Sequence, residues 1–196
     1  MDYFEVFGLP RRLGLDVAEL QRKFYELSRR THPDFHQTAP AEEQARVLET
    51  SARLNAAYRA LRDPIARVEY LVRLEEGRDT KEGAAEKLPA PPALLAEMFE
   101  IQEALEEAKA GGPEASGGEA LRARREELAA RVREVEANLA GPLSVAWDRA
   151  APEARARLLA QFKDALATRA YLRAVIDDLG QALGEGQDGH VANRRH

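Results

Sequence analysis

Long stretches of helix-forming residues, broken by proline and glycine at only a few places, restrict this chain to an all-α fold. Ala, Glu, Arg and Leu dominate its 196 residues, and β-branched residues are sparse. The stretch 42–62 shows the pattern most clearly. One stripe at helical spacing carries Val47, Ser51, Leu54, Tyr58 and Leu61.

Three helices can be predicted in the amino-terminal part from their end signals. Asp16 is a plausible N-cap for the first, which must end near Thr31 because the residue before Pro33 is pushed out of the helical region. The second covers 42–62. Asp63 followed by proline then predicts the start of a third, shorter helix.

The carboxy-terminal part is predicted to form a bundle of three antiparallel helices. A Gly-, Lys-, Glu- and Pro-rich stretch without apolar periodicity precedes it and reads as a linker. A Gly-rich insert, 111–118, separates the first two helices of the bundle. The predicted organisation is an amino-terminal domain 1–74, a linker 75–91, a bundle 92–183 with helices 92–109, 118–139 and 152–183, and a flexible tail 184–196.

Composition excludes several classes of function. A net charge of −5 gives no reason to expect nucleic acid as a partner, and the absence of cysteine excludes disulfides, thiol catalysis and thiolate metal sites. No apolar run is long enough to cross a membrane, so a cytoplasmic protein is expected. Two of the four histidines flank a loop and two lie in the tail, which argues against metal ligation. No phosphate loop or nucleophile–base pair can be assembled, so we expect neither an enzyme nor a cofactor.

The tripeptide His32-Pro33-Asp34 is the sharpest local signal in the sequence. Proline stiffens the turn, so that the two polar side chains beside it project from a rigid tip. Such a tip beside a positive helix face suits an acidic groove on another protein, although a charged helix face is also commonly just solvated. The predicted docking residues are His32, Pro33, Asp34, Arg22, Lys23, Arg29 and Arg30.

A second candidate site lies in the predicted helix 92–109. At about 100° per residue, one arc of the helix carries a core stripe, and a separate arc carries apolar and acidic side chains together. The core stripe is Leu94, Met98, Ile101, Leu105 and Ala108, and the second face is Leu95, Ala96, Phe99, Glu100, Glu103 and Glu107. Tyr171 lies off the core stripe of the last helix and could join this face. An apolar patch rimmed by charge is typical of a binding site, although Leu95 and Phe99 could instead widen the core.

The amino-terminal part resembles the J-domain of DnaJ-like proteins, in which a His-Pro-Asp loop joins two helices. The opening Met1–Pro10 and the stretches 51–58, 61–64 and 67–71 are similar to those of the HscB co-chaperones, and 100–107 is similar to their acidic binding helix. The resemblance implies that the tripeptide and the basic helix dock on a DnaK/HscA-type chaperone and trigger its ATP hydrolysis. It also implies that the apolar and acidic face binds an IscU-like iron–sulfur scaffold protein.

The sequence departs from the family pattern in two places. Phe35-His36 follows the tripeptide where the family usually has a basic residue within one or two positions, and Ala96 stands where the family tends to have a larger apolar residue. Two alternatives stay open: a J-domain co-chaperone for a different client, and a helical adaptor without a chaperone partner.

Overall fold

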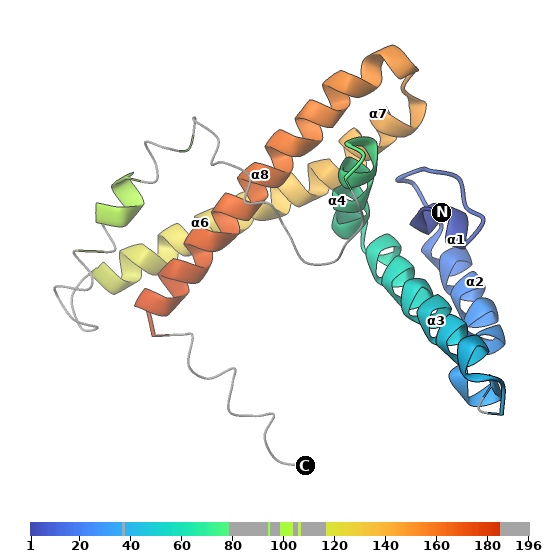
Figure 1. Cartoon of the computed structure of the whole chain (residues 1–196). Coiled ribbons are helices and arrows are strands. Elements are labelled where there is room, and N and C mark those ends of the chain that lie inside the picture. The colour runs from blue at the N-terminus through green and yellow to red at the C-terminus, as the bar shows by residue number, and fades with distance from the viewer. Residues whose placement is uncertain (37, 79–93, 95–98, 104–105, 107–116, 185–196) are drawn as a thin grey trace. The chain divides into compact units, whose positions relative to one another are not determined.

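The computed structural model describes residues 1–36, 38–78, 94, 99–103, 106 and 117–184, and within them it is helical, without a strand (Figure 1). The all-α prediction is confirmed. The elements are α1 (Tyr3–Val6), α2 (Val17–Arg30), a 3-10 turn (Pro33–His36), α3 (Ala41–Arg62), α4 (Pro64–Glu75), α6 (Gly117–Asn138), a π-helical turn (Leu139–Leu143), α7 (Ser144–Arg149) and α8 (Pro152–Ala182).

The chain divides into two compact units. One comprises Met1–Gly83 together with Asn138–Phe162, and the other comprises Ala84–Ala137 together with Lys163–His196. The first unit therefore contains α1 to α4 and also the turn between α6 and α8. Among the helices described, none is both long and apolar enough to span a membrane.

Carboxylate caps explain where α2 and α4 begin. Asp16 accepts hydrogen bonds from the backbone N–H groups of Ala18 and Glu19, as its predicted N-cap position requires. Asp63 accepts from Ala66 N at 2.8 Å with proline at the first helical position, which confirms the predicted start of α4.

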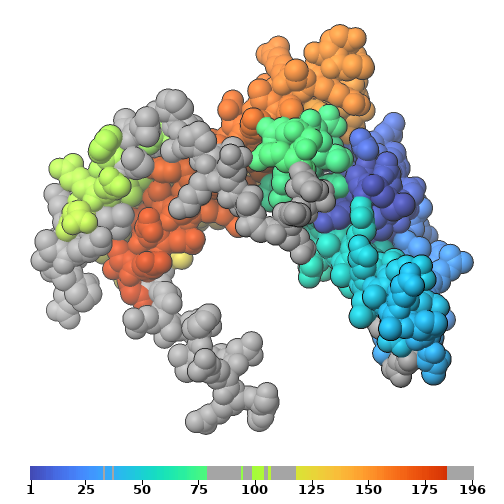
Figure 2. Space-filling model, viewed as in Figure 1, coloured from blue at the N-terminus to red at the C-terminus, as the bar shows by residue number. Residues whose placement is uncertain are grey.

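The core of the first unit forms where α1 packs against α3 and α4. The rings of Tyr3 and Tyr70 stack with centroids 4.4 Å apart, and the Tyr70 hydroxyl accepts a hydrogen bond from Tyr3 N at 2.8 Å. In Figure 2 the dark-blue atoms of α1 lie against the green atoms of α4. The side chains fully removed from solvent in this core are Phe4, Leu20, Ala57, Leu61, Val68, Tyr70 and Leu71.

α6 ends at Asn138, within one residue of the predicted end at Leu139, but the chain stays helical beyond it. The chain passes through the π-helical turn Leu139–Leu143 into α7, with Pro142 inside the turn. Proline has no N–H to donate and normally disrupts a helix, but the wider π turn accommodates it. The turn places Trp147 in the core of the first unit, where its ring meets Phe162 edge-on at 5.9 Å.

Asp148 of α7 forms hydrogen bonds with the segment that joins α1 to α2. Its two carboxylate oxygens accept from Leu13 N and from Gly14 N, each at 2.8 Å. A Cβ at position 14 would lie 3.1 Å from Asp148 Oδ2, so glycine permits this close approach. The carboxylate thus supplies acceptors for two backbone donors that belong to no helix.

Replacing Asp148 by alanine is expected to lower the free energy of unfolding by about 2 to 3 kcal/mol, because two charge-assisted hydrogen bonds are lost. Chemical denaturation followed by far-ultraviolet circular dichroism measures the change. Asp177→Ala, at an exposed position of α8, is the matched control and should change stability by less than about 0.5 kcal/mol. Equal stabilities for the two variants would show that the Asp148 contacts contribute nothing.

The second unit has its own core between α6, α8 and the helical stretch 99–103. Seven buried side chains form it, and Tyr171, Ile176 and Leu183 pack against them. The buried members are Ile101, Leu121, Leu128, Val132, Leu172, Val175 and Leu179, and Ile101 belongs to the core stripe predicted for the helix 92–109.

Several predicted segments lie partly or wholly outside the described residues. In the predicted helix 92–109, the described residues are Leu94, which is buried in a helical turn, and the helical residues 99–103 and 106. Most of the linker, of the Gly-rich insert and of the tail also lies outside, so the predicted boundaries 1–74, 75–91, 92–183 and 184–196 stay a prediction.

Candidate functional site

The His32-Pro33-Asp34 tip stands between α2 and α3, which lie side by side as a helical hairpin (Figure 1). His32 Nδ1 accepts a hydrogen bond from Asp34 N at 3.3 Å and lies 3.5 Å from Asp34 Oδ2. The side chains of His32 and Asp34 are 50% and 70% exposed. The tip is therefore ordered by its own contacts and still open to a partner.

His36, one of the residues that depart from the family pattern, supports this tip. Its Nε2 lies 3.5 Å from the carbonyl oxygen of Arg30, and its Nδ1 lies 3.4 Å from Glu43 Oε1. One imidazole thus contacts both the last residue of α2 and the first turn of α3. The departure in sequence leaves the turn structurally supported.

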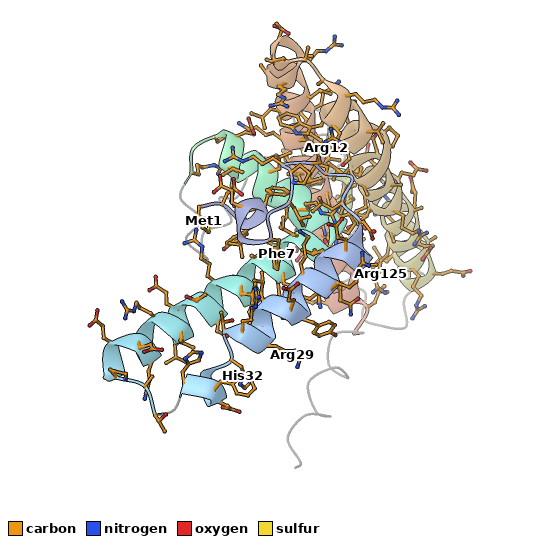
Figure 3. All side chains as sticks on the ribbon, turned by 90° about the vertical axis from the view of Figure 1, so that its right-hand side faces the viewer. Met1, Phe7, Arg12, Arg29, His32 and Arg125 are labelled. Atoms are coloured by element: carbon orange, nitrogen blue, oxygen red, sulfur yellow. The ribbon has the colours of Figure 1, made fainter. Side chains whose placement is uncertain are left out.

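The four predicted docking cations differ in their surroundings. Arg22 and Arg29 are exposed, and among the described residues no carboxylate forms an ion pair with either. Arg30 is exposed and lies 3.6 Å from Glu26. Figure 3 shows Arg29 and His32 at the same end of the hairpin.

Lys23 turns toward its own domain. Its ammonium donates to the carbonyl oxygen of Phe7 at 3.1 Å and lies 3.8 Å from Glu19 Oε1. The side chain is 33% exposed. Lys23 therefore connects the end of α1 to α2 by a hydrogen bond. Its docking role stays a prediction.

Sequence reasoning missed two exposed aromatic side chains next to these residues. Tyr25 is 57% exposed and Phe35 is 74% exposed. On α2, Arg22, Tyr25 and Arg29 fall within an arc of about 60°. The same wheel geometry, applied to α2, would have placed Tyr25 among the docking cations.

The second candidate site is partly described. Phe99 is 68% exposed and Glu100 and Glu103 are exposed, whereas Ile101 between them is 5% exposed. This short helical stretch therefore has the two faces that the wheel predicted, and Phe99 does not widen the core. Leu95, Ala96 and Glu107 lie outside the described residues.

Tyr171 is half-buried and packs against the core cluster of the second unit. The helical wheel had placed it off the core stripe, and the difference arises because α8 buries a broader face, including Val175, than the narrow predicted stripe. Its part in scaffold binding stays a prediction.

Two protein families match the sequence in separate regions. The DnaJ domain matches residues 2–70, and the family described as HSCB C-terminal oligomerisation domain matches residues 90–166. The first match contains the tip and the basic helix, and the second contains the exposed Phe99 and its neighbouring acids.

Individual proteins give the same result. The chain is 36% identical over 150 residues to the Co-chaperone protein HscB homolog of Azoarcus sp. (strain BH72), a match that covers 75% of this chain and 79% of the relative. It is 37% identical over 117 residues to the homolog from Vibrio cholerae, covering 59% of this chain and 67% of the relative.

Solved structures agree in fold. Chaperone HscB from Vibrio cholerae superposes with a TM-score of 0.61 at 28% identity, covering 94% of this chain and 99% of the other. Human co-chaperone protein HscB superposes with a TM-score of 0.63 at 23% identity, covering 92% of this chain and 81% of the other. From the family matches and the extent of these similarities, the chain belongs to the HscB family of J-domain co-chaperones.

Proposed function

We propose that this chain stimulates ATP hydrolysis by a DnaK/HscA-type chaperone and delivers an IscU-like iron–sulfur scaffold protein to it. The tip carries the first half of the proposal. An ordered and exposed His32 and Asp34 directly follow a helix whose Arg22 and Arg29 project into solvent. This arrangement fits an acidic groove on the chaperone, because charge complementarity steers association and fixes its register.

The exposed face around Phe99 supports the second half. A large apolar ring in solvent costs free energy unless a partner covers it, and Glu100 and Glu103 give the patch a charged rim. An apolar centre with a polar rim is the usual arrangement of a protein interface.

A protein with two such sites would act without chemistry of its own. Holding the scaffold and the chaperone together raises the effective concentration of one at the other. The iron–sulfur cluster would travel on the scaffold, and the chain would need no cofactor. It would work in the cytoplasm, where both partners are expected.

Steady-state ATP hydrolysis by the same organism's HscA-type chaperone, with and without this chain and the scaffold, tests the proposal. Stimulation by the chain that rises further with scaffold is expected. Stimulation indifferent to scaffold would support a J-domain co-chaperone for a different client. If no DnaK-type chaperone responds, the proposal is wrong and an adaptor without a chaperone partner becomes the better reading.

Phe99→Ala is expected to weaken scaffold binding about 30-fold, since truncating an aromatic hot spot costs about 2 kcal/mol and each 1.4 kcal/mol is tenfold. Isothermal titration calorimetry of the full chain with the scaffold measures the effect. Leu48→Ala is the matched control, because Leu48 is 57% exposed but lies on α3. Equal affinities for Phe99→Ala and the unsubstituted chain would remove Phe99 from the binding face.

A further inference from the structure

The hairpin carries exposed apolar surface within its basic face. Tyr25 and Phe35 are two of the seven large apolar side chains that are exposed in the described residues. Single exposed apolar residues are common and need no explanation. These two differ because each lies next to the residues proposed to contact the chaperone.

Tyr25 is held in place by its neighbours on α2. The Gln21 side chain donates to the Tyr25 hydroxyl at 3.3 Å, and the Phe24 ring lies 5.8 Å away, centroid to centroid. Phe24 is itself stacked on Tyr58 of α3 at 4.2 Å. These contacts restrict the Tyr25 side chain before binding, which lowers the conformational entropy that docking costs.

Phe35 extends the tip. It belongs to the 3-10 turn that starts at Pro33, and its ring meets His32 edge-on with centroids 5.9 Å apart. The ring thus stands beside the imidazole that is proposed to dock. Any partner that contacts His32 closely must also cover part of Phe35.

The composition of this surface is that of an interface centre. Tyrosine, phenylalanine and arginine are enriched in the buried middle of protein interfaces, where lysine and acidic residues are depleted. On α2 Tyr25 shares an arc of about 60° with Arg22 and Arg29. The aromatic ring therefore adds apolar surface to the stripe that carries these two arginines.

We infer that Tyr25 and Phe35 form an aromatic part of the chaperone-docking surface, and that the matching DnaK/HscA-type chaperone has apolar surface bordering its acidic groove. This inference rests on the proposed function. Charge would bring the two proteins together, and burial of the two rings would hold them and select between chaperones with similar charge.

The test compares Tyr25→Ala, Phe35→Ala and the double variant in stimulating ATP hydrolysis by the same organism's HscA-type chaperone. Each single change is expected to raise the concentration of half-maximal stimulation about tenfold, and the double change about a hundredfold. The maximal stimulated rate should stay unchanged, because the tip itself is intact. Val17→Ala is the control, since Val17 is 44% exposed at the opposite end of α2.

Salt distinguishes the aromatic contribution from the charges. The concentration of half-maximal stimulation is measured at low and high ionic strength and divided by that of the unsubstituted chain. For Tyr25→Ala this ratio should not change with salt. For Arg22→Ala it should shrink, because salt screens the charge. Circular dichroism spectra and melting curves like those of the parent chain would show that the variants are folded.

Two results would overturn the inference. If Tyr25→Ala and Phe35→Ala match the parent chain while His32→Gln abolishes stimulation, the rings are not part of the interface and the proposed function stands. If the parent chain itself stimulates no chaperone, the proposed function fails and the aromatic surface fails with it.

Discussion

Replacing His32 by glutamine is expected to abolish nearly all stimulation of ATP hydrolysis by the chaperone while leaving the fold intact. The imidazole Nδ1 accepts from Asp34 N and faces the Asp34 carboxylate, so it sets the conformation of the tip. Glutamine is flexible and cannot reproduce that rigid ring, and a displaced tip loses the geometry on which catalysis by a partner depends.

His32→Gln should abolish stimulation of ATP hydrolysis without lowering the stability of the fold. His32 is half-exposed, and surface substitutions of this kind alter stability by only about 0.5 kcal/mol. Steady-state hydrolysis and a melting curve, measured on the same preparation, make the comparison. Asp34→Asn should behave like His32→Gln, and Asp177→Asn on α8 should behave like the unsubstituted chain. Full stimulation by His32→Gln would remove the tip from the mechanism.

Replacing Arg67 by methionine is expected to destabilise the first unit by about 3 kcal/mol, because buried carbonyl groups would lose their donors. Arg67 is 4% exposed. Its Nε donates to the carbonyl oxygen of Leu61 at 2.7 Å, and its Nη1 donates to that of Leu13. Burial lowers the pKa of the guanidinium, and the charges of Asp63 and Asp148 oppose that shift.

The single tryptophan provides the measurement. Trp147 lies buried in the same unit, so its fluorescence during urea denaturation reports that unit. Arg12→Met is the matched control, because the Arg12 side chain is exposed (Figure 3). If Arg67→Met and Arg12→Met shift the midpoint equally, the hydrogen bonds of Arg67 contribute little to stability.

Local signals allowed the helices of the hairpin to be predicted from sequence. Asp16, Asp63 and Pro33 act on their immediate neighbours, through caps and steric exclusion, so the ends of α2 and the start of α4 lie where these residues predict. Apolar residues at helical spacing are similarly local signals, and Leu121, Leu128 and Val132 of α6 lie in the buried core.

Features that depend on distant residues could not be predicted. Lys23 carries a charge that the sequence alone assigns to solvent, and only the fold shows the Phe7 carbonyl within its reach. Gly141-Pro142 resembles a helix stop, although packing keeps the chain helical through it. The docking role of the tip and of the Phe99 face follows from exposure and family resemblance, so it stays a prediction until the partners are measured.

The Asp148 contacts have a consequence for how this chain could have been assembled during evolution. The acceptor for Leu13 and Gly14 comes 134 or more residues later in the sequence, from within the second matched family region. A fragment cut after α4 would lack that acceptor, and Arg67 would lose the charge of Asp148 while keeping that of Asp63. We therefore expect this J-domain to be less stable when it is moved alone into another protein. Gene fusions and chimeric co-chaperones should include α7 together with it.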